Sequence, residues 1–461
     1  MTWHYMLQNQ KNMENRIISK YLHTLFETNG TDAEWFGYYN YDPLNEDHTK
    51  MLCNRSSVEC KNANRERDNL LKIGYYELST GEWHQIGETD SWNWQQGAMA
   101  QWLPGKGNEN KVIYNCSRDG HLTSRIFDIV TGETKEIDWS IYGLTPDGKK
   151  SIALDMERSY WCRAYHYQSV ANPKKNGRIV EGDGIFEVDL EKNTHRLIID
   201  IKDVVAKDAD DDFDLMKHWL EHIMINPSGS RFCFLHRYAP LDNVRQYRTR
   251  LCIADIDGKN LQVMPGWNIF MWSHFGWQGD DRFTIYSYKR PSLYKKFDVK
   301  PNCVASNNPK VSAGKFVKRF AMYVKGLIPK SLIRKFLSKS SYYQYYSVGD
   351  KGKFMLTGQW IRPYFDVDGH PSFTSDGKYM LTDSYPDTKG YRRYIVFNTA
   401  TGKGMIIAKM KENAKQGNAA CDLHPKLSRD NQNVIFDTTS SGKHTMMLFR
   451  INWDQIKNKI S

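Results

Sequence analysis

The chain has 461 residues, of which 40% are hydrophobic and 25% are charged, and its formal net charge is +11. With a mean hydropathy of −0.67, these values indicate a globular protein with a full hydrophobic core. They exclude a disordered tail, a collagen-like chain and a small disulfide scaffold. Ten of the eleven excess positive charges lie in residues 299–349, which contain no acidic residue. Because the rest of the chain is nearly neutral, we expect no nucleic-acid partner.

The beginning of the chain predicts a cytoplasmic protein with a helical N-terminal segment. No run approaches the roughly 18 apolar residues of a membrane-spanning helix, and residues 1–16 lack the apolar stretch of a secretory signal. The eight cysteines are scattered without a CxxC pair, which favours reduced thiols over a zinc or redox motif. Residues 14–27 place apolar side chains at helical spacing, so we expect a helical segment over residues 1–34.

From residue 35 to residue 461, one pattern recurs seven times. Each copy is a Pro/Asp/Gly-type turn and a short apolar strand, as in TSDGKYMLTD, followed by a hairpin with a tight turn, as in YIVFNTATGKGMII. The copies begin at Asn45, Leu103, Thr145, Asn226, Gln278, Thr374 and Ser428. This repetition predicts an all-β, seven-bladed β-propeller, with early strands closing the ring on residues 444–453. A β-sandwich with similar turn spacing is the alternative.

Two segments interrupt the repeats. Residues 211–221 predict one or two helical turns leading into the fourth blade. The basic residues 299–349 are expected as an insertion between blades five and six, with two amphipathic helical segments over 315–339 broken at Pro329. Its cations and apolar face favour peripheral association of residues 310–340 with an anionic membrane surface. The alternatives are a lid that attracts an acidic saccharide and a solvated loop.

The repeat register places histidines at one structural position in the last four blades. The residues four places before each copy are Tyr41, Met99, Ile141, His222, His274, His370 and His424. In a propeller these positions begin the innermost strands and surround the mouth of the central channel. Buried imidazoles repay their burial only when they are hydrogen-bonded or ligated. We therefore predict a functional site there, although a single inward histidine is more often part of the core.

Carboxylates accompany two of these histidines. Asp422 precedes His424 by two residues and Asp368 precedes His370 by two, so each pair lies on one side of an extended strand. Neutral imidazoles with one or two carboxylates suit Mn²⁺, Fe²⁺ or Zn²⁺ better than Ca²⁺. The sequence therefore predicts a divalent-metal site.

The stretch WNWQQG, residues 92–97, enters the second blade at the same rim. Aromatic rings beside amides are typical of sugar sites, so Trp94, Gln95 and Gln96 are candidate substrate contacts. Packing of the tryptophans between blades is the alternative. The chain has no P-loop, no GxSxG elbow and no GxGxxG between a strand and a helix. Paired carboxylates for glycoside hydrolysis remain open, but none is singled out by the register.

The late repeats resemble a known family. HFGWQGDDRFTIYS, GHPSFTSDGKYMLTDSYPD and DLHPKLSRDNQNVIFDTTSSG are similar to the late blades of the oligogalacturonate lyases, cytoplasmic seven-bladed propellers related to the TolB and WD40-like propellers. The resemblance covers roughly residues 215–455. It implies a Mn²⁺ site that binds the uronate carboxylate, a histidine base and a nearby arginine.

Carried onto this sequence, the resemblance implies His274 as the base and Arg250 as the arginine. It implies His370 as a metal ligand, and it replaces the HxH pair of the seventh blade by Asp422 and His424.

Other positions are less well matched. A family glutamine ligand falls near Ala419, which cannot bind a metal, so this chain departs from the family there. His222, His236 and Asp368 are further candidates for substrate contact.

The chemistry of uronates agrees with these residues. A β-elimination removes the C5 proton, which is weakly acidic because the adjacent carboxylate is anionic, and a metal that neutralises this carboxylate stabilises the intermediate. A neutral imidazole is a suitable base near neutral pH. The sequence thus predicts a metal-dependent carbon–oxygen lyase in carbohydrate metabolism. The alternatives are another carbohydrate-active enzyme, such as a hydrolase or an epimerase, and a non-catalytic carbohydrate-binding propeller; no protein partner is indicated.

Overall fold

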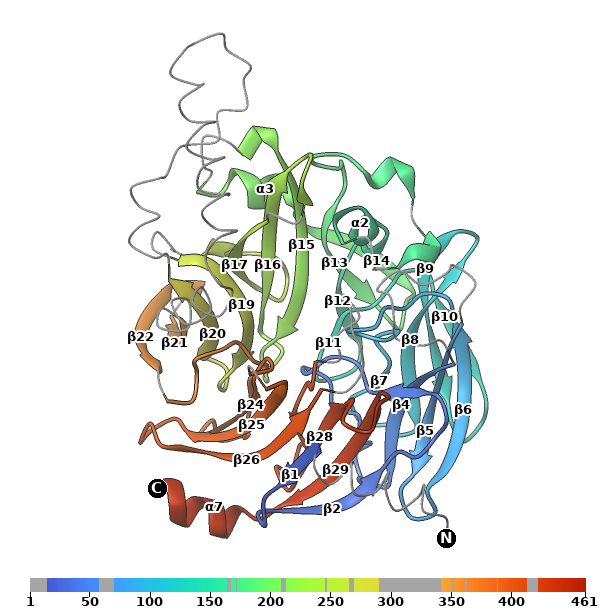
Figure 1. Ribbon diagram of the computed structural model, residues 1–461. Helices are drawn as coiled ribbons and strands as arrows, with labels where there is room; N and C mark the ends of the chain where they lie inside the picture. The colour runs from blue at the N-terminus through green and yellow to red at the C-terminus, as the bar shows by residue number, and fades with distance from the viewer. Residues whose placement is uncertain are drawn as a thin grey trace.

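Seven antiparallel sheets form the blades of a β-propeller (Figure 1), which confirms the predicted fold class. The computed structural model describes residues 15–57, 70–163, 167–170, 172–208, 213–244, 247–264, 269–289, 341–349, 352–360, 363–387, 389–412 and 422–461. In blades 1 to 5 the first strand along the chain takes the predicted inner position, and the following strands lie successively further out. In blades 6 and 7 the strands β23 and β27 take the inner position, and an N-terminal strand is added at the outer edge.

The first four blades have four strands each. Blade 1 contains β3 (Ala33–Trp35), β4 (Lys50–Ser56), β5 (Leu71–Glu77) and β6 (Glu82–Thr89). Blade 2 contains β7 (Gln101–Trp102), β8 (Lys111–Arg118), β9 (His121–Asp128) and β10 (Thr134–Ile137). Blade 3 contains β11 (Gly143–Leu144), β12 (Lys150–Leu154), β13 (Gly184–Asp189) and β14 (Thr194–Asp200). Blade 4 contains β15 (Met216–Ile225), β16 (Arg231–Pro240), β17 (Arg248–Asp255) and β18 (Gln262–Val263).

The last three blades include both N-terminal strands. Blade 5 contains β19 (Ile269–Trp277), β20 (Arg282–Lys289), β21 (Ser341–Val348) and β22 (Phe354–Trp360). Blade 6 contains β23 (Ser372–Phe373), β24 (Tyr379–Asp383), β25 (Tyr391–Asn398), β26 (Gly404–Lys411) and β1 (Arg16–Ile18). Blade 7 contains β27 (Lys426–Leu427), β28 (Asn433–Thr438), β29 (Thr445–Ile451) and β2 (Leu22–Glu27).

The two ends of the chain close the ring. Strand β2 pairs with β29 and strand β1 pairs with β26, so the blue N-terminal strands lie among the red C-terminal ones in Figure 1. Closure on residues 444–453 is therefore as predicted. The prediction of a helix over residues 14–27 is wrong, because residues 16–18 and 22–27 pair with strands that lie far along the sequence, and these pairings override local helical spacing.

Helices are few in the described part of the chain. They are α2 (Met156–Cys162), α3 (Ile201–Ala206) and α7 (Trp453–Ile460), with short 3₁₀ segments η1 (Gln168–Val170), η2 (Pro173–Lys175) and η3 (Phe213–Leu215). The helical prediction for residues 211–221 is correct only for η3, since β15 begins at Met216. No helix in the described ranges is long and apolar enough to cross a membrane.

The structure corrects the position of the basic insertion. The strands that flank it, β20 and β21, are neighbours in blade 5, so it interrupts that blade and does not separate blades five and six. Residues 341–348 of the basic segment form β21 itself. The predicted amphipathic helices over 315–339 lie outside the described residues.

The repeated turns have a local cause. In the sixth blade Thr374 Oγ1 donates to Asp376 Oδ1 at 2.7 Å, and the same carboxylate oxygen accepts the amide of Lys378 at 3.0 Å. Gly377 follows in the left-handed region at φ +67°, where a residue without Cβ is favoured. Asp147 and its neighbours repeat these bonds in the third blade. Such turns form from neighbouring residues alone, which explains why the repeats were visible in the sequence.

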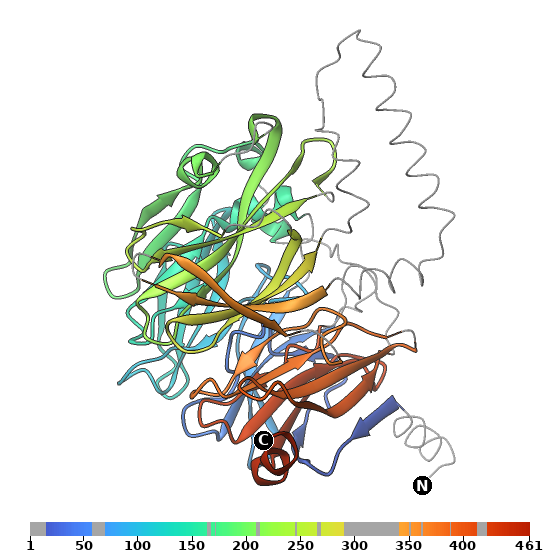
Figure 2. The ribbon, with the colours of Figure 1, turned by 90° about the vertical axis from the view of Figure 1, so that its left-hand side faces the viewer.

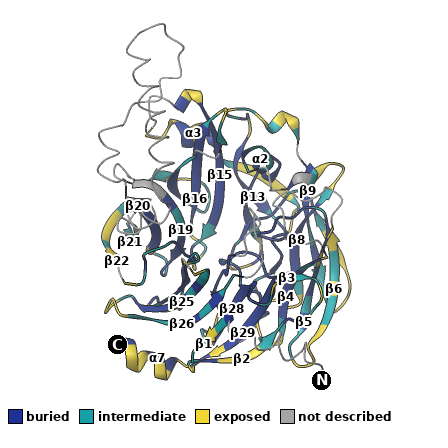
Figure 3. Ribbon diagram, in the orientation of Figure 1, coloured by how far each residue is buried: buried dark blue, intermediate teal, exposed yellow. Residues whose placement is uncertain are grey.

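The hydrophobic core lies mainly between adjacent blades. The largest cluster joins residues of blades 2, 3 and 4, and separate clusters fill the contacts between the other blades. Buried residues follow the interior of the ring, while the outer strands and α7 carry exposed residues (Figure 3). In the view turned by 90°, the blades lie side by side and α7 lies at the lower edge of the molecule (Figure 2). This packing fixes the inner strands, which carry the candidate site.

Candidate active site

Three of the four register histidines gather in the channel. His274 lies in β19, His370 precedes β23 and His424 precedes β27, so three successive blades each contribute one ring. The ring centroids of His274 and His370 are 3.9 Å apart, and those of His370 and His424 are 4.6 Å apart. The first strands of these blades therefore line the axis, as the sequence register predicted.

Backbone irregularities turn these side chains inward. Strand β15 shifts register between Glu221 and Met224, and β19 shifts between Trp272 and Phe275. Each bulge contains the register histidine of its blade. His222 and His424 also have left-handed φ values of +56° and +40°, a conformation that side chains other than glycine seldom adopt. Met99, at the same register position in the second blade, also has φ +57°, so this backbone conformation belongs to the repeat and is not confined to the histidines.

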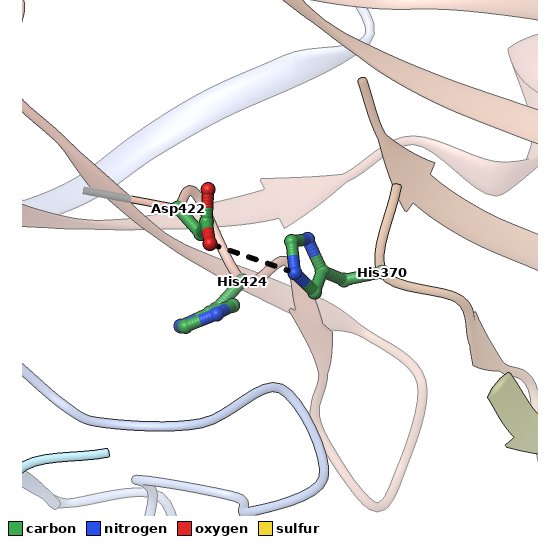
Figure 4. Close-up of side chains that lie close together, drawn as sticks. All are labelled: His370, Asp422 and His424. Atoms are coloured by element: carbon green, nitrogen blue, oxygen red, sulfur yellow. Dashed lines mark ion pairs between the residues drawn. The ribbon is translucent and has the colours of Figure 1, made fainter. Parts of the chain in front are cut away.

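His370, Asp422 and His424 are buried, and each contributes one possible metal-ligand atom (Figure 4). These three atoms lie within 4.8 Å of one another. His370 Nε2 and Asp422 Oδ2 are 3.9 Å apart, too far for a direct hydrogen bond. Neither His370 Nε2 nor His424 Nε2 has a hydrogen-bond partner within the described residues. Two buried nitrogens that lack partners are costly unless something binds them.

The other ring nitrogens are held so that both Nε2 atoms keep a lone pair. His370 Nδ1 lies 2.9 Å and 3.1 Å from the two oxygens of Asp383, which also accepts the backbone amide of His370 at 2.6 Å. His424 Nδ1 donates to the carbonyl of Gly37 at 2.6 Å. Carboxylates and carbonyls accept only, so each Nδ1 carries the proton. Gly37 has φ +123°, and a Cβ there would lie 3.0 Å from the carbonyl oxygen of Gln96.

Asp422 is the charged member of the trio. Burial opposes its ionisation, but Arg392 and the surrounding imidazoles outweigh burial and lower the pKa of Asp422. Arg392 Nη1 donates to Asp422 Oδ1 at 3.2 Å, and the hydroxyl of Tyr385 lies 3.5 Å from Oδ2. Asp422 therefore presents a carboxylate to the two imidazoles.

These three residues fit a divalent cation. Burial and the neighbouring His274 lower the pKa of His370 well below its usual value, and burial lowers the pKa of His424 to about 3. Both imidazoles are therefore neutral, as metal ligands must be. A ligating histidine usually donates its other nitrogen to a carboxylate or carbonyl, as Asp383 and Gly37 allow here. Two imidazoles and one carboxylate suit Mn²⁺, Fe²⁺ or Zn²⁺.

His274 stands beside this trio with a carboxylate of its own. Its Nδ1 lies 3.2 Å from Asp368 Oδ2, so Nδ1 carries the proton and Nε2 is left as a base. Burial favours the neutral ring, but Asp368 outweighs it and raises the pKa of His274. A histidine oriented by a carboxylate is the usual arrangement of a general base. Asp368 is thus placed to orient His274 rather than to touch a substrate.

His222 is separated from the other three histidines by Tyr38. Its ring stacks on Tyr38 at 5.3 Å, and its Nε2 lies 3.2 Å from Glu221 Oε2. Its Nδ1 lies 3.5 Å from the hydroxyl of Tyr142, which accepts a bond from Gln96 Nε2 at 2.9 Å. Burial lowers the pKa of His222 to about 4. Both nitrogens are thus engaged within the protein, so His222 is less suited to bind substrate than predicted.

Tyr38 and Tyr39 pack against the register histidines. Tyr38 contacts His370 and His424 edge-on at 6.4 Å and 5.0 Å between ring centroids. Tyr39 contacts His274 at 6.0 Å and donates its hydroxyl to the carbonyl of Phe275 at 2.7 Å. These two rings, from the segment between β3 and β4, support the histidine cluster from one side.

Arg250 does not lie among the histidines of the site. Arg250 lies on β17, the third strand of blade 4, and its guanidinium donates to the carbonyls of Val204, Lys207 and Asp208 at 2.6–3.1 Å. It thereby caps the C-terminal end of α3, which favours a cation. The catalytic role assigned to Arg250 is therefore corrected to a structural one.

His236 is also engaged elsewhere. Arg250 Nε donates to His236 Nδ1 at 3.0 Å, and His236 Nε2 lies 3.0 Å from His218 Nδ1. His218 Nε2 in turn donates to the carbonyl of Phe213 at 2.8 Å. This chain of bonds inside blade 4 uses both nitrogens of His236, so the structure does not support a substrate contact there.

The tryptophans of residues 92–97 belong to the core. Trp94 is 5% exposed and lies 4.9 Å from Trp35 and 5.1 Å from Trp92 between ring centroids. The prediction of Trp94 as a sugar-stacking residue is thus corrected to its alternative, packing between blades. Gln96 is buried and bonded to Tyr142, and the backbone amide of Gln95 donates to Asn93. Among these residues only Gln96 reaches toward the channel, through Tyr142.

Three residues of the site were missed by the sequence analysis. Asp383 ends the repeat TSDGKYMLTD at the place where Asp437 ends SRDNQNVIFD, so a repeated carboxylate was the available signal. Arg392 and Gly37 carried no comparable signal. Ala419, the position of the departure from the family, lies outside the described residues.

The fold and this cluster define a class: a seven-bladed β-propeller whose last three blades hold a buried histidine–carboxylate site. Among solved structures the chain is similar to an oligogalacturonate lyase in complex with manganese, with 15% identity, a TM-score of 0.55 and coverage of 95% of this chain and 97% of that one. It is also similar to an oligogalacturonate lyase from Vibrio parahaemolyticus, with 14% identity, a TM-score of 0.53 and coverage of 94% and 96%. No protein-family model and no curated protein matches the chain. The chain therefore has the fold of the oligogalacturonate lyases, as its late repeats predicted.

Proposed function

We propose that this protein is a metal-dependent lyase that cleaves uronate-containing oligosaccharides by β-elimination. The observation that carries the proposal is the contact between a candidate base and a cluster of candidate metal ligands. A carboxylate-oriented imidazole, His274, lies against His370. His370, Asp422 and His424 each bring a possible ligand atom within 4.8 Å of the others. The similarity to an oligogalacturonate lyase that was solved with manganese adds support for this class of activity.

His370, Asp422 and His424 would hold the cation. When bound, a divalent cation supplies a Lewis acid that neutralises a uronate carboxylate and thereby acidifies the adjacent C–H bond. Asp383 and Gly37 keep the two imidazoles in the tautomer that presents Nε2. Arg392 keeps Asp422 ionised.

His274 would remove the proton. Asp368 holds the Nδ1–H of His274, so that Nε2 of the neutral ring can accept the C5 proton of the uronate. The C5–H pair becomes the C4–C5 double bond, and the C4–O bond breaks as the departing sugar oxygen takes up a proton. No water molecule attacks, which fits a site built from imidazoles rather than from a pair of catalytic carboxylates.

Incubation with oligogalacturonates and Mn²⁺ tests this function, with His274→Gln as the control variant. The expected result is new ultraviolet absorbance from the unsaturated C4–C5 product in the wild type and its loss in the variant. New reducing ends without absorbance would indicate a hydrolase. Saturable binding without either product would indicate a carbohydrate-binding propeller. Each of these two outcomes would overturn the lyase proposal.

A further inference from the structure

The two oxygens of the Asp422 carboxylate have different partners, because Arg392 bonds only Oδ1. Its Nη1 donates to Oδ1 at 3.2 Å, while Oδ2 is the oxygen that lies 3.9 Å from His370 Nε2. Arg392 is 2% exposed and Asp422 is 4% exposed, so water competes little for these contacts. Asp422 therefore presents Oδ2 to the site, while Oδ1 is bonded to the guanidinium of Arg392.

The position of Arg392 is itself fixed from two sides. Its Nη2 donates to Glu412 Oε1 at 2.9 Å, and its guanidinium lies 5.2 Å from the ring centroid of Tyr385. Glu412 balances the charge of Arg392, so Asp422 keeps its own negative charge for the site. A planar guanidinium held at both nitrogens cannot turn away easily.

We propose that Arg392 determines which cation the site accepts, by withholding one oxygen of Asp422. This inference rests on the proposed metal dependence. Ca²⁺ takes six to eight oxygen ligands and often binds a carboxylate through both oxygens. Two imidazole nitrogens and a single oxygen are a poor set for Ca²⁺ and a good one for Mn²⁺ or Zn²⁺. Arg392 thus acts through Asp422 as a specificity-determining residue without touching the cation.

The adjacent arginine offers a matched control. Arg393 follows Arg392 on β25, but its side chain bonds to Asp366 and Ser384 and not to the trio. Arg393→Met removes a charge and an ion pair from the same strand. It should leave cation preference unchanged.

The test is a titration of the metal-free protein with Mn²⁺ and, separately, with Ca²⁺, followed by calorimetry. The key variant is the double substitution Arg392→Met with Glu412→Gln, which removes one charge of each sign. The net charge of the protein is thus preserved. A changed preference between Mn²⁺ and Ca²⁺ therefore reflects which oxygens of Asp422 can bind the cation. Arg392→Lys, which keeps the charge but loses the fork, is the second variant in case the double variant fails to fold.

We expect wild type and Arg393→Met to prefer Mn²⁺ over Ca²⁺ strongly. The double variant should lose at least tenfold of that preference, and Arg392→Lys should lie between them. An unchanged preference in folded variants would overturn the role of Arg392 and leave the lyase proposal standing. If the wild type binds no Mn²⁺, the proposed function fails, and the inference fails with it.

Discussion

Replacing Asp383 by asparagine tests how the protein prepares His370 to bind a cation. Asp383 Oδ1 accepts both the backbone amide and Nδ1 of His370, at 2.6 Å and 2.9 Å, and Oδ2 lies 3.1 Å from Nδ1. An asparagine oxygen can replace Oδ1 in both bonds. What the variant loses is the negative charge that makes Nε2 a stronger ligand.

The expected loss can be stated in advance. Removing the outer partner of a ligating histidine typically costs 10- to 100-fold in metal affinity, which is about 1.4 to 2.7 kcal/mol. Because both hydrogen bonds to His370 can be kept in Asp383→Asn, we expect a value near the lower end. Calorimetric titration with Mn²⁺ measures it, and thermal unfolding checks that the variant is folded.

Asp437→Asn is the matched control. Asp437 has the same place in the seventh blade, but its Oδ1 accepts the backbone amide of Phe36 at 3.3 Å instead of an imidazole. Burial raises the pKa of Asp437 well above its usual value. Asp437→Asn therefore makes the same change at a buried carboxyl that orients no imidazole. Equal Mn²⁺ affinity in wild type and folded Asp383→Asn would refute the proposed role of Asp383.

Three further predictions concern single residues. His274→Gln should lower turnover by roughly 10²- to 10⁴-fold with little change in Mn²⁺ affinity; loss of Mn²⁺ binding would place His274 among the ligands. Arg250→Met should destabilise the fold by about 3 kcal/mol through its lost buried hydrogen bonds, and reduced turnover in fully folded protein would return Arg250 to the site. Burial lowers the pKa of His444 from 6.5 to about 4, so unfolded chains bind its proton first and stability falls between pH 6.5 and pH 4. His444→Phe should lessen this fall in thermal midpoint, and an unchanged pH dependence would contradict the assignment.

The repeats and the histidine register could be predicted from the sequence because both depend on neighbouring residues. The bonds of Thr374 and Asp376 lie within one turn, and a turn followed by an alternating strand fixes the blade. In a seven-bladed ring, the register of His370 and His424 places them at the start of inner strands. Inner strands surround the axis of a propeller, so these side chains were expected close together. The prediction of a divalent-metal site followed from the types of residue at that position.

Tertiary structure alone decided what those side chains meet. Residues 16–27 form strands because β26 and β29, at the other end of the sequence, supply their hydrogen-bond partners. Arg250 and Trp94 carry side chains suited to substrate, yet one caps α3 and the other packs against Trp35. The direction of a side chain and the identity of its neighbours depend on which blades lie side by side. Local spacing cannot show this, because the contacting residues are far apart along the chain.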